Sequence, residues 1–251
     1  MHLRKDPRDM NLIGKAALIT GSTSGIGRAA AERLAHDGAA VIISGRDPER
    51  GAEVVAQIVA EGGQARFVAA DLGNFEDVKR LAKEAADVDI LVNNAGIFPG
   101  GPTDQLDEAD FDATFAVNVK APFFLTAAIA PNMVAKGAGA IISISTMAAT
   151  IGMSGLSAYG ASKAALEALT RAWTAEYGPG GVRGNVVAPG PTRTPASAAM
   201  GEMFDALAST LPAGRGASPA EIAAAVAFLA SDDASFVYGA ILPADGGRVA
   251  V

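Results

Sequence analysis

The sequence contains no cysteine and only two histidines among its 251 residues. Without cysteine, a disulfide framework, a thiolate zinc site and a cysteine nucleophile are all excluded. His2 lies in a charged leader and His36 in a polar His-Asp-Gly stretch, which is typical of solvated histidines. We therefore expect no metal site and no Ser-His-Asp triad.

Positive charge is also scarce, because 20 Lys and Arg residues stand against 27 Asp and Glu residues. The formal net charge of −7 would repel a polyanion, so nucleic acid is not an expected partner. No run approaches the roughly 18 consecutive apolar residues of a membrane helix, and the charged leader 1–10 does not resemble a secretory signal. These absences favour a cytoplasmic enzyme with a flexible leader and no membrane partner.

Half of the residues are hydrophobic, and they recur in a β-α-β alternation. Short β-branched runs predict strands at residues 16–20, 40–44, 65–69, 90–92, 140–145, 182–187 and 240–242. Longer alanine-rich stretches predict helices at residues 26–37, 48–61, 76–86, 107–136, 158–177 and 219–230. Continuous apolar strands are typical of a parallel sheet covered on both faces. We expect one α/β domain over residues 11–251, a doubly wound, Rossmann-like parallel sheet.

A glycine-rich turn directly follows the first predicted strand and opens the first predicted helix. Its glycines, Gly21, Gly25 and Gly27, have the spacing G-x-x-x-G-x-G and not the commoner G-x-G-x-x-G. Missing side chains would let the backbone approach a pyrophosphate, whose charge the helix N-terminus stabilises. A structural turn is the alternative interpretation, although the position at the first strand–helix junction favours a phosphate site.

The end of the second predicted strand bears on the choice of cofactor. The strand ends Ser44-Gly45-Arg46-Asp47, with glycine where an NAD site usually places a carboxylate. Arg46 favours a 2′-phosphate, because a guanidinium binds phosphate in a charge-assisted fork. We therefore expect NADP, but Arg46 could instead pair with an acidic neighbour, and Asp47 leaves NAD open.

Further motifs occur downstream in a fixed order. They are Asn93-Asn94-Ala95-Gly96, the Y-x-x-x-K pair Tyr159 and Lys163, P-G-x-x-x-T from Pro189 to Thr194, and Asp245-Gly246-Gly247. With these motifs the chain resembles the short-chain dehydrogenase/reductase family over residues 14–247, in particular its 3-oxoacyl-reductase-like members. The resemblance implies a tyrosine general acid/base, a lysine that lowers its pKa and holds the nicotinamide ribose, a hydroxyl that binds the substrate oxygen, and a helix asparagine that holds a proton-relay water.

The chemistry of the residues agrees with these roles. On a helix, Tyr159 and Lys163 are four residues apart and share one face, where the ammonium would stabilise a phenolate. A tyrosine with a pKa near 10 is a poor base at neutral pH unless a cationic neighbour lowers that value. We therefore predict that Lys163 lowers the pKa of Tyr159.

The hydroxyl partner departs from the family pattern, in which a serine stands 13 positions before the tyrosine. Here that position holds Thr146, whose hydroxyl can still donate to a carbonyl oxygen although its methyl stiffens the side chain. Ser145 is the fallback, and strand alternation points it toward the sheet interior. Asn118 matches the helix asparagine, and an amide satisfied by backbone is compatible with that role.

The resemblance also implies a set of cofactor-binding residues. Beside the glycine turn with its Thr23, Ser24 and Ile26, and beside Arg46, Tyr159 and Lys163, they are Asp71 and Leu72 at the adenine, Asn94, Ala95 and Gly96 along the ribose, and Pro189, Gly190, Thr192 and Thr194 at the carboxamide and diphosphate. Asn93 looks structural, tying neighbouring strands together.

We therefore predict an NADP(H)-preferring oxidoreductase that interconverts a ketone and a secondary alcohol. The alternatives are an NAD-dependent alcohol dehydrogenase of the same fold and a nucleotide-binding regulatory protein without turnover. Segment 189–218, rich in proline and without clear periodicity, is the expected substrate flap. A small neutral or apolar substrate is favoured by the candidate pocket residues Ile97, Phe98, Met147, Met153, Pro191, Met200, Met203 and Phe204, which could also be plain packing. The apolar segment 236–242 and the resemblance favour a homotetramer.

Overall fold

The computed structural model describes residues 12–251, so the predicted flexible leader 1–10 lies outside the described residues. Seven parallel strands form one sheet in the order β3-β2-β1-β4-β5-β6-β7. The strands are β1 (Ala16–Thr20), β2 (Ala40–Gly45), β3 (Gln64–Ala69), β4 (Ile90–Asn93), β5 (Gly139–Ile144), β6 (Val182–Pro189) and β7 (Ile241–Ala244). The predicted Rossmann-like parallel sheet is confirmed, and each predicted strand agrees with an observed one to within two residues at either end.

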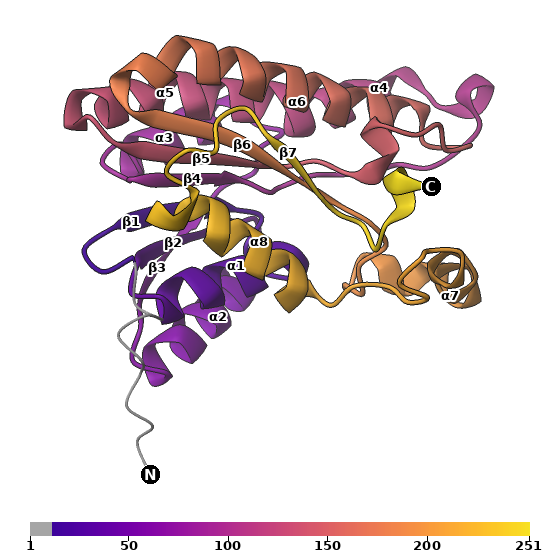
Figure 1. The fold of residues 1–251 in the computed structure, drawn as a ribbon, viewed down its shortest axis with the longest axis horizontal. Coiled ribbons are helices and arrows are strands. Elements are labelled where there is room, and N and C mark those ends of the chain that lie inside the picture. Colours follow the sequence, from indigo (N-terminus) through magenta and orange to yellow (C-terminus); the bar gives the residue numbers. More distant parts are fainter. Residues whose placement is uncertain (1–11) are drawn as a thin grey trace.

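Helices cover both faces of this sheet (Figure 1). One face carries α1 (Gly25–His36), α2 (Pro48–Ala60) and α8 (Pro219–Ala230). The other carries α3 (Phe75–Glu84), α4 (Glu108–Phe115), α5 (Ala121–Lys136) and α6 (Ser157–Tyr177). The chain is therefore doubly wound, as its β-α-β alternation predicts.

Two hydrophobic cores lie on the two sides of the sheet, and successive strand residues alternate between them. In β1, Ala17 and Ile19 belong to the core under α1 and α8, whereas Leu18 belongs to the core under α3, α5 and α6. All three side chains are fully buried. An interior strand of this kind has no solvent face, so it reads as an unbroken apolar run.

The predicted helix at residues 107–136 contains an interruption. A five-residue π-helical segment, Ala116–Lys120, separates α4 from α5, and π segments commonly occur at functional sites. The whole helix, Glu108–Lys136, is long and apolar enough to cross a membrane by length and composition. However, Leu125, Ile129 and Met133 are completely buried in the core against the sheet. It is a core helix.

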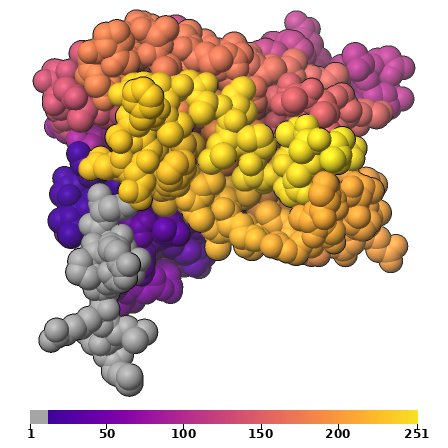
Figure 2. Space-filling model, in the orientation of Figure 1, coloured from indigo at the N-terminus to yellow at the C-terminus, as the bar shows by residue number. Residues whose placement is uncertain are grey.

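Segment 189–218 contains secondary structure that sequence periodicity missed. Short helix α7 (Glu202–Ser209) buries Phe204 and Ala208, and Figure 2 shows this part of the chain projecting as a corner of the molecule. An eight-residue helix with two buried side chains carries too little apolar pattern for detection. The neck of the segment is closed by a β-bridge between Thr192 and Ala217. The segment is therefore tied at its base.

Candidate active site

A cleft of about 320 Å³ opens at the carboxyl ends of the central strands. This is where doubly wound sheets bind ligands, because the strand order reverses there. The predicted cofactor residues that line it are Gly21, Thr23, Ser24, Gly25, Ile26, Gly27, Arg46, Asp71, Leu72, Asn94, Ala95, Gly96 and Thr194. Most of the predicted set, drawn from distant parts of the chain, thus lies around one cavity.

The glycine turn has the shape of a phosphate cradle. Gly21 and Gly25 have φ of 63° and 56°, which favour glycine. Gly27 is required for space, because a Cβ there would lie 2.4 Å from Asn94 Nδ2. Within the described chain, Ser24 provides no side-chain cap for α1, and no acidic residue occupies the first turn. The N-terminal amides of α1 are therefore available to an anion, and the residues fit a dinucleotide pyrophosphate.

Thr20, which the sequence analysis did not assign to the site, joins this turn to the Asn94-Ala95-Gly96 segment. Its Oγ1 accepts hydrogen bonds from the backbone N–H groups of Asn94 and Ala95, both at 3.0 Å. The Asn94 amide Nδ2 donates to the carbonyl oxygens of Thr20 at 2.8 Å and Gly21 at 3.2 Å. A buried hydroxyl ending an otherwise apolar strand is the signal that could have identified Thr20.

Arg46 stands exposed at the lip of the cleft. Within residues 12–251 it forms no ion pair, because Asp47 pairs with Arg50 at 3.3 Å and caps α2 through the N–H groups of Glu49 and Arg50. The neighbouring Gly45 has little room for a side chain, since its Cβ would lie 2.8 Å from Thr23 Cγ2. The cleft therefore presents a free guanidinium, without a carboxylate at position 45.

Helix α6 places Tyr159 beside Thr146 at the end of β5. Burial raises the pKa of Tyr159 above its ordinary value of 10.0, while a hydrogen bond with Thr146 acts in the opposite direction. The contact stabilises the phenolate, which is the form a general base requires. The hydroxyl beside the tyrosine is thus that of Thr146, at the position the family spacing indicates.

Lys163 lies one turn along α6, almost completely buried. Its Nζ donates to the carbonyl oxygen of Ile144 at 2.8 Å, and burial lowers its pKa from 10.5 to about 8. Burial is the largest cause acting on the pKa of Tyr159 and Thr146 opposes it, so a lowering by Lys163 stays a prediction. A Cβ on Gly96 would lie 3.1 Å from Lys163 Nζ, so the absent side chain brings the ammonium to the cleft wall.

Asn118 lies in the π segment and holds the loop after β4. Its side chain accepts from Ile97 N at 3.0 Å and donates to Ile97 O at 2.9 Å. A further bond of 3.0 Å reaches the hydroxyl of Ser162 on α6. The amide is thus satisfied by backbone and by one hydroxyl, and it connects the cleft wall to the helix that carries Tyr159.

Ser145 faces away from the tyrosine. Its hydroxyl donates to Glu167 Oε1 on α6 at 2.6 Å, and both residues are buried. Glu167 lies about two helical turns beyond Tyr159 along α6, so the Ser145 hydroxyl is engaged away from the tyrosine. Glu167 is a second residue that sequence reasoning missed, since a lone glutamate on a predicted helix reads as solvent-exposed.

The family profile described as Enoyl-(Acyl carrier protein) reductase matches residues 21–248. A solved structure described as a short chain dehydrogenase/reductase family protein is 53% identical, covers 96% of this chain and 100% of its own, and has a TM-score of 0.91. The chain belongs to the short-chain dehydrogenase/reductase family. The predicted resemblance is therefore confirmed.

Two further members are similar over nearly the whole chain. A 3-oxoacyl (acyl-carrier-protein) reductase from Agrobacterium tumefaciens with NADP bound is 34% identical, covers 97% of each chain and has a TM-score of 0.91. Cis-4-hydroxycyclohexanecarboxylate dehydrogenase of Sinomonas cyclohexanicum is 39% identical over 94% of this chain and 97% of its own. This short-chain dehydrogenase is an NAD(P)-dependent oxidoreductase that acts on an alcohol or ketone.

Some predicted residues of this short-chain dehydrogenase lie outside the cofactor cleft. Gly190 lines a separate cavity of about 160 Å³, packed so closely on Asp245 that a Cβ would lie 2.7 Å from the aspartate Cα. Thr192 is buried and donates to Gly190 O at 3.0 Å, and Pro189 ends β6 in the core. Asn93 donates to Thr126 of α5 at 3.4 Å, so its side chain ties sheet to helix, not strand to strand.

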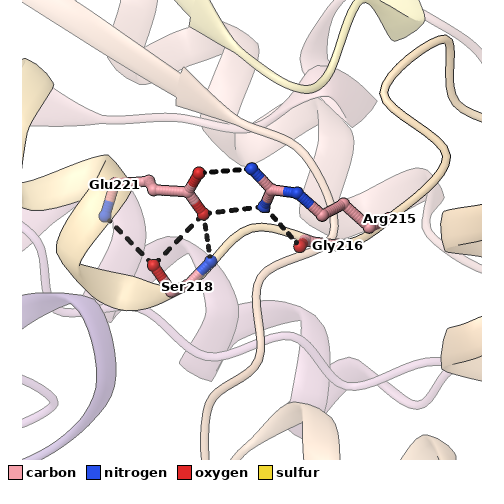
Figure 3. Close-up of polar contacts among 4 residues, drawn as sticks. All are labelled: Arg215, Gly216, Ser218 and Glu221. Carbon is pink, nitrogen blue, oxygen red and sulfur yellow. Dashed lines mark hydrogen bonds and ion pairs between the residues drawn. The ribbon is translucent and has the colours of Figure 1, made fainter.

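Segment 189–218, the predicted substrate flap, is joined to α8 by an ion pair (Figure 3). Arg215 binds both carboxylate oxygens of Glu221, at 2.9 and 2.7 Å, and Glu221 also accepts from the backbone N–H of Ser218 at 2.8 Å. The Arg215 bond is the largest cause that lowers the pKa of Glu221, from 4.5 to about 2. At its other end this segment approaches the glycine turn, since a Cβ on Gly25 would lie 3.3 Å from Thr194 Cγ2.

Proposed function

We propose that this protein is an NADP(H)-preferring oxidoreductase that interconverts a small ketone and a secondary alcohol, with Tyr159 as general acid/base. The observation that carries the proposal is Tyr159 beside the Thr146 hydroxyl, which lowers its pKa, with the buried Lys163 one turn along α6, next to a cleft that fits a dinucleotide. A tyrosine with a hydroxyl partner and an adjacent cation is a complete set for moving one proton at a carbonyl oxygen.

When bound, a nicotinamide cofactor supplies the hydride for reduction and accepts it in oxidation. In reduction, Tyr159 donates its phenolic proton to the substrate oxygen as the carbonyl becomes an alcohol. Thr146 donates a hydrogen bond to the same oxygen and holds it against the phenol. Lys163 stabilises the phenolate that remains, and the Ile144 carbonyl orients its ammonium. In oxidation the phenolate takes the alcohol proton.

NADP preference is supported by the unpaired Arg46 at the lip of the cleft. A guanidinium without an acidic partner can bind a 2′-phosphate in a bidentate manner. The alternative, NAD, would need an acceptor for the ribose hydroxyl, and Asp47 is already engaged with α2 and Arg50. The NADP bound to the Agrobacterium relative points the same way.

A small neutral or apolar substrate is supported by the walls beside Tyr159. Segments 97–102 and 146–156 contain no Asp, Glu, Lys or Arg residue. They are joined by a 3.0 Å hydrogen bond from Gly101 N to Gly155 O, and Phe98 approaches Tyr159 with ring centroids 5.8 Å apart. Apolar surroundings exclude a highly charged skeleton because its desolvation would be uncompensated. The Sinomonas relative, named for an alicyclic hydroxy acid, is consistent with a compact carbon skeleton.

A homotetramer in the cytoplasm completes the proposal. Phe236 is 98% exposed and Tyr238 43% exposed beside β7, and Phe111, Phe123 and Phe124 are exposed on α4 and α5. Aromatic side chains in such numbers on a surface are typical of association between subunits. The absence of cysteine agrees with a compartment in which disulfides are not used.

Turnover with purified protein tests the function directly. NADPH oxidation is followed at 340 nm with a panel of alicyclic, aliphatic and polyhydroxy ketones, with NADH in parallel. We expect activity with neutral ketones, and we expect Tyr159→Phe to abolish it while the variant still binds NADPH. Cofactor binding without turnover of any ketone or alcohol by the wild type would favour the regulatory alternative instead.

A further inference from the structure

A ladder of polar contacts joins one face of α6 to the end of β5. Its four helix residues are Tyr159, Lys163, Glu167 and Thr170, which share one face at helical spacing. They contact, in turn, the Thr146 hydroxyl, the Ile144 carbonyl, the Ser145 hydroxyl and the Ser143 hydroxyl. The first two contacts belong to the proposed chemistry. The third, between Glu167 and Ser145, has no role in it.

A glutamate side chain is rarely buried, as Glu167 is here. Glu167 is 6% exposed and Ser145 3% exposed, and the bond between them is 2.6 Å long. A carboxylate in the interior is costly unless hydrogen bonds or a cation satisfy it. Throughout the described chain, no Lys, Arg or His forms an ion pair with Glu167. Among the described residues, Ser145 is the only one that hydrogen-bonds the carboxylate.

Ser145 stands between the two strand residues that touch the proton-transfer pair. The carbonyl oxygen of the preceding residue, Ile144, accepts a hydrogen bond from Lys163 Nζ, and the hydroxyl of the following residue, Thr146, lies beside Tyr159 and lowers its pKa. Displacing Ser145 would displace both neighbours, because they share one backbone. A shift of about 1 Å in reacting groups can cost on the order of 10²-fold in rate.

We propose that Glu167 is a positioning residue that sets the alignment of the end of β5 with α6 through Ser145. The bond determines where the Thr146 hydroxyl and the Ile144 carbonyl meet Tyr159 and Lys163. The proposal rests on the proposed function, since it assigns a purpose to an alignment that matters only if Tyr159 and Thr146 act on the substrate. Glu167 contacts neither substrate nor cofactor itself.

Two alanine substitutions, one in β5 and one just after its end, test the proposal. Ser145→Ala removes the hydroxyl that binds Glu167, and Ser143→Ala is the matched control, because it removes the hydroxyl 2.8 Å from Thr170 on the same face of the strand. We expect Ser145→Ala to lower kcat by roughly tenfold with an unchanged KM for NADPH. We expect Ser143→Ala to retain near wild-type kcat, even where thermal denaturation shows a similar loss of stability. Equal losses of kcat in the two variants would overturn the proposal.

Substitutions at Glu167 distinguish the loss of its hydrogen bond with Ser145 from a nonspecific loss of activity. Glu167→Gln keeps an oxygen that accepts from Ser145 and should retain most of the kcat, whereas Glu167→Leu should match Ser145→Ala. The double variant Ser145→Ala/Glu167→Leu should be no slower than either single variant, because both remove one contact. Additive losses, or a Glu167→Gln variant as slow as Glu167→Leu, would refute a role through this bond.

Tyr159→Phe distinguishes a failure of the proposed function from a failure of the positioning role of Glu167. If Tyr159→Phe retains turnover, the proposed function fails. If Tyr159→Phe is inactive while Ser145→Ala and Glu167→Leu both retain wild-type kcat, the chemistry stands and the positioning role of Glu167 is refuted.

Discussion

Replacing Thr146 by valine removes one hydroxyl and conserves the β-branched shape. In the structure that hydroxyl has two roles, since it lowers the pKa of Tyr159 and accepts from Ala148 N at 3.2 Å at the start of a short 3₁₀ turn. Loss of the second contact costs about 0.5–2 kcal/mol of stability, as for other N-cap residues. Loss of a donor to the reacting oxygen costs roughly 2.7–4 kcal/mol in activation free energy, or about 10²–10³ in kcat.

The assay is steady-state reduction and oxidation with one ketone–alcohol pair. The KM for the cofactor should barely change in Thr146→Val, because Thr146 does not line the cofactor cleft. The wild-type Thr146 hydroxyl lowers the pKa of Tyr159, so its removal should raise that pKa. In the oxidation direction, the rise of activity with pH should therefore move to higher pH in Thr146→Val. Thr146→Ser keeps the donor and is the control, with most of the wild-type kcat expected.

The comparison with Ser145 decides the assignment of the hydroxyl. Ser145→Ala should slow turnover far less than Thr146→Val, because the Ser145 hydroxyl is bound to Glu167 and not directed at Tyr159. If Ser145→Ala abolishes turnover and Thr146→Val is tolerated, the substrate oxygen is held by the serine, and the catalytic assignment of Thr146 is wrong.

Arg46→Ala should raise the KM for NADPH far more than that for NADH, by the equivalent of about 1.5–3 kcal/mol for a lost charge-assisted contact, and equal effects on both would contradict the NADP assignment. The Arg215 bond lowers the pKa of Glu221 to about 2, so the stability it contributes is complete above pH 4.5 and is lost as the pH falls through about 2. The difference in urea midpoint between wild type and Glu221→Gln should therefore close over that window, and a constant difference would refute the argument. Burial lowers the pKa of Lys163 from 10.5 to about 8, so between these values the unfolded chain binds more protons and stability rises with pH. Wild type should gain stability relative to Lys163→Met from pH 8 to 10.5 in chemical denaturation, and no gain would show that the ammonium is not desolvated. Light scattering at micromolar concentration should give the mass of a tetramer, and a monomer mass would rule out the proposed assembly.

The sequence alone determined the order and type of nearly all the sheet elements. Strands such as β1 are apolar on both sides, and α6 begins at a motif whose spacing already places Tyr159 and Lys163 on one face. These signals are local, because periodicity, glycine turns and chain order require no knowledge of distant contacts. The glycine turn, the Tyr–Lys pair and the position of Thr146 could all be predicted for this reason.

Only the tertiary structure decided which partner each polar group takes. It paired Asp47 with Arg50, left Arg46 without an ion pair among residues 12–251, and buried Glu167 against Ser145. Short elements such as α7 also escaped prediction, because their stability comes from packing on the rest of the fold and not from their own sequence pattern. Hydrogen-bond partners far apart in the chain depend on how helices settle on the sheet, and that geometry is a property of the whole core.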